Sequence, residues 1–372
     1  MTWTLRIGNL LNIRGSVESQ SAVVMVNPEA MIPSDHPIRV IKKIVDEVLD
    51  RIGPQLEAIY AERGRPSIPP ETLLKAQILI ALYTVRSERL FCERLRYDFL
   101  FRWFLDLRDG LTTFDATTFS KNRERLLKAD IFAEFFDEVV EEARRRRLLS
   151  DEHFTVDGTM IEANASLKSF RKKDGGSPPD GSGSNPEVNF RGEKRKNDTH
   201  ESTTDPEAKL YRKGDGQPAQ LCYLGHVLME NRNGLCTDAI LTSASGRAEP
   251  EAALEMVRRS TEPLRRRVTL GADKGYDRGE FHIGLVENGV VPHIAQIEGI
   301  HPLIDRRTTR RSGYQMSQRK RKRVEEIFGW GKTVGGIAKT RFRGAVRVGA
   351  QFLMTMSTYN LVRMARLELA VT

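Results

Sequence analysis

Three acidic residues stand where they could bind metal ions, although they lie far apart in the sequence. Asp157 interrupts an alternating apolar stretch that predicts a strand, Asp273 follows a second apolar strand, and Glu325 lies on a late helix. Functional sites in open α/β sheets gather at the carboxyl ends of strands. Three carboxylates that meet there need hard cations to offset their charge, and Mg²⁺ is usually held by one or two carboxylates together with phosphates.

Such a site would suit two Mg²⁺ ions, with Mn²⁺ as a substitute. Two ions about 3.5–4 Å apart bind both the attacking and the leaving oxygen of an in-line phosphodiester displacement. Each aspartate also has an ordinary structural explanation, since Asp157 could be paired across the sheet and Asp273 could cap a turn. For either one alone, that explanation is favoured.

The helix around Glu325 has an unusual face. At about 100° per residue, Arg321, Glu325, Phe328 and Lys332 fall on one side of it. An acid flanked by cations suits a site that holds a metal and a polyanion together, although a surface helix with Arg–Glu pairs at i,i+4 would give the same pattern. Glu326 lies about 100° away and cannot share this face.

Composition sets the wider limits. The chain has 372 residues, a formal net charge of +9 and a pI of about 9.5, which favours two domains and a polyanionic partner such as nucleic acid. No apolar run reaches the roughly 18 residues of a membrane span. The three cysteines show no spacing for a zinc site or a redox pair, so we expect a cytoplasmic, nucleoid-associated protein with reduced thiols.

The sequence divides into three parts. Residues 1–34 show no sustained period and predict a loosely ordered lead-in, and residues 35–150 predict helices. One of these helices follows Asp115 or Thr117 as its cap, in a pattern that resembles a helix-turn-helix or, equally well, a plain bundle. It is expected to present the polar residues Lys121, Asn122, Arg123 and Arg125 to solvent.

Residues 151–372 predict an α/β domain with a mixed sheet. Strands are expected near 154–161, 268–272 and 290–296, an Asn-Gly hairpin at 233–234, and helices near 249–259 and 280–288. Residues 168–218, rich in Gly, Pro, Ser and charge, are expected to interrupt this domain as a flexible loop.

The chain resembles the DDE-type insertion-sequence transposases, in the insertion-sequence-five branch, from about residue 35 to residue 363. The segments VDGT at 156–159 and GADKGYD at 271–277 resemble those that carry the first two family aspartates. The family motif Tyr-x2-Arg-x3-Glu-x6-Lys is matched by Arg321, Glu325 and Lys332. Its tyrosine position is Gln318 here, which puts one DNA contact in question. Two glycines, Gly329 and Gly331, predict that the helix ends or bends before Lys332.

The resemblance implies a ribonuclease-H-like catalytic domain preceded by a helical DNA-binding domain. It also implies Mg²⁺-dependent cleavage at transposon ends, followed by attack of the freed 3′-hydroxyl on target DNA. By this likeness Asp157, Asp273 and Glu325 hold the metals, and Arg321 and Lys332 hold end-DNA phosphates. The expected partners are double-stranded DNA and a second copy of the chain, without a membrane or a nucleotide cofactor.

Further cations are expected at the DNA: Arg319, Lys320, Arg323, Lys121, Arg123 and Arg125. Two other functions stay open. One is a metal-dependent nuclease that does not join strands, and the other is a catalytically inactive DNA-binding repressor. The presence of all three acids argues against the repressor.

Overall fold

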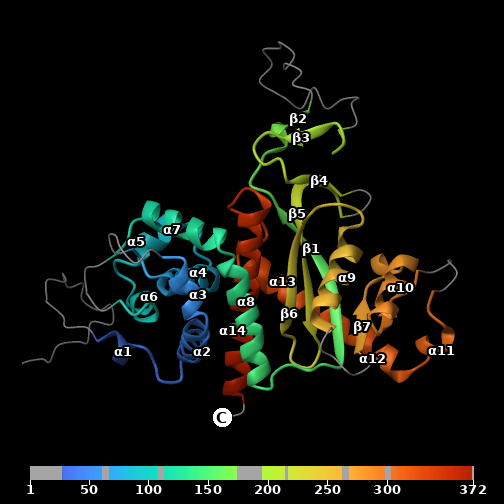
Figure 1. The fold of residues 1–372 in the computed structure, drawn as a ribbon, viewed down its shortest axis with the longest axis horizontal. Coiled ribbons are helices and arrows are strands. Elements are labelled where there is room, and N and C mark those ends of the chain that lie inside the picture. The colour runs from blue at the N-terminus through green and yellow to red at the C-terminus, as the bar shows by residue number, and fades with distance from the viewer. Residues whose placement is uncertain are drawn as a thin grey trace, which may run out of the picture.

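The N-terminal part of the chain is helical, as expected. The computed structural model describes residues 27–60, 67–107, 113–173, 195–213, 217–261, 268–297 and 303–370 (Figure 1). The first eight helices are α1 (Pro28–Met31), α2 (Pro37–Arg51), α3 (Gly53–Ala58), α4 (Pro70–Leu82), α5 (Glu88–Arg94), α6 (Phe99–Phe104), α7 (Ala116–Lys128) and α8 (Ile131–Arg145). Most of the expected lead-in, residues 1–26, lies outside the described residues.

Local capping explains where two of these helices begin. The backbone N–H of Leu90 donates to the Ser87 hydroxyl at the start of α5, and the N–H groups of Thr117 and Thr118 donate to the Asp115 carboxylate at the start of α7. On α7, however, Asn122 is buried rather than exposed. Its side chain is bonded to Ser67 and to the carbonyl of Thr118, so the prediction that it faces solvent was wrong.

The second part is built on a mixed sheet of six strands. Its order is β4-β5-β1-β7-β8, with β6 also paired to β5. The bounds are β1 (His153–Glu162), β4 (Lys209–Tyr211), β5 (Gln220–Glu230), β6 (Cys236–Ser243), β7 (Val268–Ala272) and β8 (Val290–Ile294). Strands β1, β7 and β8 run parallel, while β5 is antiparallel to β1, β4 and β6. The Asn233-Gly234 turn joins β5 to β6, with Gly234 at a φ of 75°.

Helices cover both faces of this sheet. On one face, Phe154 and Val156 pack with Ala253 and Met256 of α9 (Ala248–Thr261), beside α10 (Gly279–Glu287). On the other, Ile161 packs with residues of α13 (Val324–Thr333) and α14 (Ala345–Leu369). Helices α11 (Arg306–Thr309) and α12 (Ser312–Lys320) precede α13. A helical N-terminal region followed by a mixed sheet with helices on both faces is the ribonuclease-H-like architecture that was expected.

Two expectations about the elements need correction. Part of the expected loop 168–218 is structured, because β2 (Phe170–Lys172) pairs with β3 (His200–Ser202) and β4 extends the main sheet. Residues 174–194 and 214–216 lie outside the described residues. Helix α13 continues through Lys332 to Thr333, so its glycines do not end it. Gly331 instead allows close packing, because a Cβ there would lie 2.9 Å from Ile337.

Helix α14 lies within residues 151–372, which were expected to form the catalytic domain. Figure 1 shows this helix running between the helical region and the sheet. Its residues Leu361 and Met364 belong to the core of the helical region, whereas Phe352 and Met356 belong to the core beneath the sheet. The two regions therefore share one helix. Over the described residues, no helix combines the length and apolarity needed to cross a bilayer.

Candidate active site

The register of two parallel strands places two of the predicted acids side by side. Thr155 of β1 pairs with Gly271 of β7, so Asp157 and Asp273, each two residues further on, stand at the same level. Neighbouring strands are about 4.8 Å apart, and residues two apart share a face. Asp157 and Asp273 therefore both lie at the carboxyl end of β7, on the face that α12 and α13 cover.

Strand β1 extends beyond its neighbour at this point. It continues to Glu162, whereas its last residue paired with β7 is Thr155. No strand of the described chain therefore lies against the edge of β1 beside Asp157 on the β7 side. Side chains from both faces of the sheet can approach this edge.

Electrostatics agree with the strand register. Burial raises the pKa of Asp157 from 3.8 to about 6, with further contributions from the carboxylates of Asp273 and Glu249. The N–H of Gly158 donates to Asp157 at 2.8 Å and opposes the rise. Asp273 accepts a hydrogen bond of 2.7 Å from the N–H of Gly275, so it also caps the turn that follows β7.

The third predicted acid comes from α13. Val324, Ile327 and Phe328 face the core, and Glu325 and Lys332 share one flank of the helix. Glu326 lies on the other flank, where its charge acts on Tyr359 of α14. Glu325 is exposed and makes no hydrogen bond or ion pair within the described residues. This geometry favours Glu325 over Glu326.

Lys332 lies within the electrostatic reach of one of the two aspartates, Asp157. Burial lowers the pKa of Lys332, as does the nearby Lys213, while Asp157 raises it. Both lysines line a cavity of about 240 Å³, together with Glu162, Gln217 and Gln220. Two cations beside a pair of carboxylates can hold a phosphate next to metal ligands.

Arg321 is positioned by the residue that departs from the family motif. Gln318 donates to the carbonyl of His293 at 2.5 Å and accepts from Arg321 Nε at 3.0 Å. A Cβ at Gly271 would lie 3.0 Å from Ser317 Oγ and 3.5 Å from Arg321 Cβ, so this helix segment packs directly on the backbone of β7. This close packing explains why the first residue of GADKGYD, Gly271, has no side chain.

The other predicted DNA contacts differ in their surroundings. Arg319, Lys320, Lys121 and Arg125 have exposed side chains, and Arg125 stacks on Tyr60 at 4.7 Å. Arg323 instead donates to the carbonyls of Asn231 and Arg232 in the β5–β6 turn. Arg123 is 12% exposed, pairs with Glu88 and stacks on Phe342 at 4.5 Å. These contacts give Arg323 and Arg123 structural roles.

Sequence reasoning missed three residues near the aspartates. Glu249, at the start of α9, and Lys213 both influence Asp157, and Tyr276 is buried beside them. Tyr276 lies in the GADKGYD segment, which was a usable signal. Nothing in the local pattern of Glu249 or Lys213 separates them from ordinary surface charges.

The donor set fits a hard divalent ion held partly by water and substrate. Asp157 and Asp273 supply carboxylate oxygens near one another, and the buried hydroxyl of Tyr276, on which both act, has no hydrogen-bond partner among the described residues. Among the described residues, no three His, Cys, Asp or Glu side chains converge closely enough to enclose a metal. The remaining ligands would be waters, DNA phosphate and a carboxylate that moves in.

Comparisons with known proteins agree with these features. Residues 26–125 match a family described as a transposase domain, and residues 149–361 match one described as a transposase DDE domain. The cryo-EM structure of a piggyBac transposase synaptic complex with hairpin DNA resembles the chain with a TM-score of 0.41 and 9% identity. That likeness covers 88% of this chain and 75% of the other. No curated protein matches this sequence.

Proposed function

Because this chain belongs to the family of transposases with a DDE domain, we propose that it cleaves and joins the DNA ends of an insertion sequence. It binds the inverted-repeat ends, hydrolyses a phosphodiester bond at each, and transfers the freed 3′-hydroxyl to target DNA. The observation that supports this proposal most directly is that Asp157 and Asp273 follow paired positions of β1 and β7, with Lys332 near Asp157.

The residues have separate roles in this proposal. Asp157 and Asp273 would hold two Mg²⁺ ions, or Mn²⁺ in their place, with Glu325 approaching from α13 as the third carboxylate. The bound ions supply Lewis-acid activation of water and of the scissile phosphate. Lys332 and Arg321 orient end-DNA phosphates by charge-assisted hydrogen bonds, and Arg321 is itself held by Gln318.

The partners follow from the reaction. Two transposon ends need two active sites, so we propose that the chain acts as a homodimer on double-stranded DNA. The exposed cations of α7 and α12, Lys121, Arg125, Arg319 and Lys320, would contribute phosphate contacts that depend on salt. The helical region would supply end recognition.

Alanine substitutions test the metal-binding role. Asp157→Ala, Asp273→Ala and Glu325→Ala should each abolish Mg²⁺-dependent cleavage of end DNA while leaving DNA binding largely intact. Glu326→Ala is the matched control, because it removes the same charge one residue away on the opposite flank of α13. Residual cutting above about 1% of wild type would remove that acid from the metal-binding role.

A strand-transfer assay with pre-cleaved ends separates the alternatives. Joining to target DNA supports a transposase. Cleavage without joining would identify a nuclease, and specific binding without either reaction in Mg²⁺ or Mn²⁺ would identify a repressor.

A further inference from the structure

Glu249 lies against the backbone of β1 next to Asp157, although it comes from the opposite face of the sheet. A Cβ on Gly158 would lie 3.1 Å from Glu249 Oε1 and 3.1 Å from His226 Nδ1. Glycine at 158 therefore leaves room for the carboxylate and the imidazole to approach the strand. Glu249 makes no hydrogen bond or ion pair within the described residues, although the charges of Lys213 and Arg278 act on it and partly offset the rise of its pKa on burial.

Two buried polar atoms at this place also lack partners. The hydroxyl of Tyr276, on a side chain only 1% exposed, has no hydrogen-bond partner in the described structure, and neither does Nδ1 of the fully buried His226. Burial raises the pKa of Tyr276, and the carboxylates of Glu249, Asp157 and Asp273 raise it further, so all three charges act on this hydroxyl. A buried polar atom without a partner costs about 1–3 kcal/mol, so such atoms signal a missing ligand.

We propose that Glu249 is a fourth carboxylate of the metal centre, and that the Tyr276 hydroxyl and the His226 imidazole hydrogen-bond to water on the bound divalent ion. This inference rests on the proposed function. Among the described residues these carboxylates do not yet enclose a metal, so Glu249 from one face and Asp157 from the other would close on a shared ion at the open edge of β1 beyond Thr155. Water-bearing hard cations suit carboxylates and hydroxyls from several elements.

The test is calorimetric titration of Mn²⁺ into the full chain without DNA, so that binding is measured apart from catalysis. Glu249→Gln should weaken Mn²⁺ binding about tenfold or more, or remove one of two binding steps. Its metal-free melting temperature should not fall, since one of several mutually repelling carboxylates is gone. The matched control is Glu255→Gln, on the same helix with its side chain 51% exposed, which should bind Mn²⁺ as wild type does.

Two further variants make the outcome decisive. Asp157→Asn should greatly reduce Mn²⁺ binding. If Asp157→Asn reduces Mn²⁺ binding and Glu249→Gln does not, Glu249 is not a metal ligand and the proposed function stands. Unchanged Mn²⁺ binding in both variants would overturn the metal centre itself. Tyr276→Phe keeps the ring contact with Phe281 at 5.4 Å and removes only the hydroxyl. It should weaken Mn²⁺ binding several-fold, and unaltered Mn²⁺ affinity in this variant would likewise count against the hydroxyl's role.

Discussion

The partly buried carboxylate of Asp157 lowers the stability of the metal-free protein, which an apolar residue at this strand position would not do. Its carboxylate is partly buried near Asp273 and Glu249, and within the described part of the chain only the neighbouring Gly158 N–H donates to it. An apolar residue at 157 would stabilise the metal-free sheet. The site thus trades stability for a cluster of negative charge that only a cation can neutralise.

The stability of the metal-free protein should therefore depend on pH through Asp157. Because its pKa rises from 3.8 in the unfolded chain to about 6 in the folded protein, the folded state holds this proton longer. The stabilisation is complete below about pH 4 and is lost as the pH rises through about 6. Urea unfolding in a chelator, measured as wild type minus Asp157→Asn, should show this loss. A difference that does not change with pH would contradict the assignment.

Gln318 makes hydrogen bonds on both sides at the position where the family motif has tyrosine. It stands at the motif's tyrosine position and links the His293 carbonyl to Arg321. The nearby Tyr314 donates instead to the carbonyl of Ile294 at 2.8 Å. The departure from the motif thus leaves Arg321 supported, which fits an intact phosphate contact.

At the scale of elements, the decisive feature is the change of helix geometry before Glu325. Residues Arg321–Arg323 form a 3-10 turn between α12 and α13. A 3-10 turn advances by about 120° per residue rather than 100°, so the face predicted for one continuous helix is not preserved. The turn therefore changes the direction of Arg321 relative to Glu325, whereas within α13 Phe328 faces the core and Glu325 and Lys332 share the outer flank.

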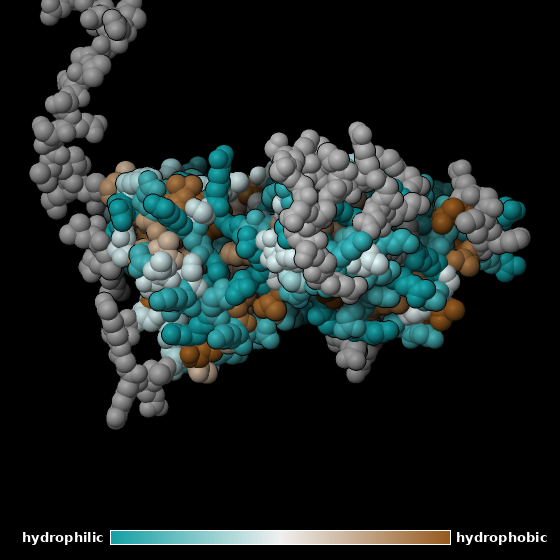
Figure 2. All heavy atoms as spheres, turned by 90° about the horizontal axis from the view of Figure 1, so that it is seen from above, coloured by the Kyte–Doolittle hydropathy of each residue, from teal (hydrophilic) through white to brown (hydrophobic). Residues whose placement is uncertain are grey.

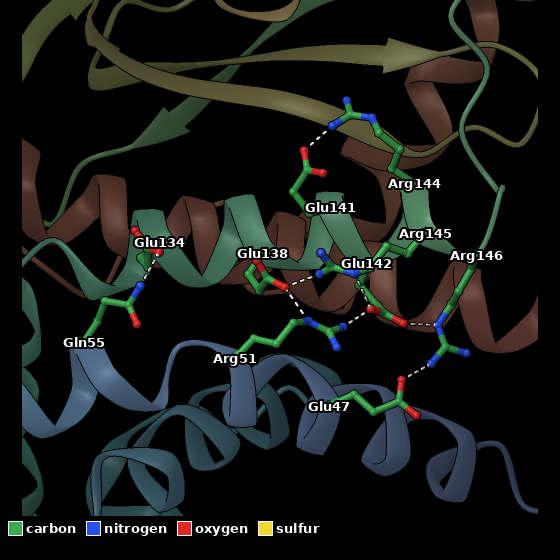
Figure 3. A network of polar contacts seen from close by, with 10 residues as sticks. All are labelled: Glu47, Arg51, Gln55, Glu134, Glu138, Glu141, Glu142, Arg144, Arg145 and Arg146. Carbon is green, nitrogen blue, oxygen red and sulfur yellow. Dashed lines mark hydrogen bonds and ion pairs between the residues drawn. The ribbon is translucent and has the colours of Figure 1, made fainter.

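A network of charges joins α8 to α2, as Figure 3 shows, and one further ion pair extends it to α14. Glu142 of α8 has a side chain only 5% exposed and pairs with Arg51, Arg145 and Arg146. Arg146 also pairs with Glu47 of α2 and with Glu368 of α14. The cations that end α8 thus hold helices together as well as complementing the helix dipole.

Glu142→Ala should destabilise the protein by about 3 kcal/mol, because it leaves clustered arginines without their shared carboxylate. Glu141→Ala, on the same helix, removes a pair with Arg144 in which both side chains are about half exposed. That variant should cost less than about 1 kcal/mol. Urea unfolding of the two variants provides the comparison, and equal costs would mean that burial does not govern this network.

At the scale of the molecule, α14 makes the helical region and the sheet depend on each other. Asn360 of α14 bonds both the N–H and the carbonyl of Cys236 in β6, at 2.9 and 2.8 Å. Deleting the N-terminal 150 residues would therefore expose the apolar side of α14, so point substitutions give a cleaner test of end recognition.

The face of the molecule in Figure 2 is mostly hydrophilic, with hydrophobic residues only in small groups.

The two regions should consequently unfold together. Trp103 reports on the helical region and Trp330 on the core beneath the sheet. Each is followed in a variant in which it is the only tryptophan, so Trp3 is replaced by Phe in both variants. Leu361→Ala, in the helical core, should lower stability by about 3 kcal/mol and shift both fluorescence transitions to the same lower denaturant concentration. Separate midpoints for Trp103 and Trp330 would show that α14 does not couple the regions.

The sequence by itself determined the elements and the candidate acids. Alternation predicted β1 and β7, the Asn-Gly pair predicted the hairpin, and Ser87 and Asp115 marked helix starts, because these signals depend on neighbouring residues alone. It also placed Asp157 and Asp273 at strand positions where parallel pairing could align them.

Only the tertiary structure decided what surrounds those acids. The contact of Glu249 with β1, the burial of the Tyr276 hydroxyl and the sharing of α14 join segments that are distant in the chain. No local periodicity encodes such contacts, because they depend on the strand order and on which helix packs on which face. The same reason explains why Arg123 and Asn122, predicted on an exposed face, have partners within the chain.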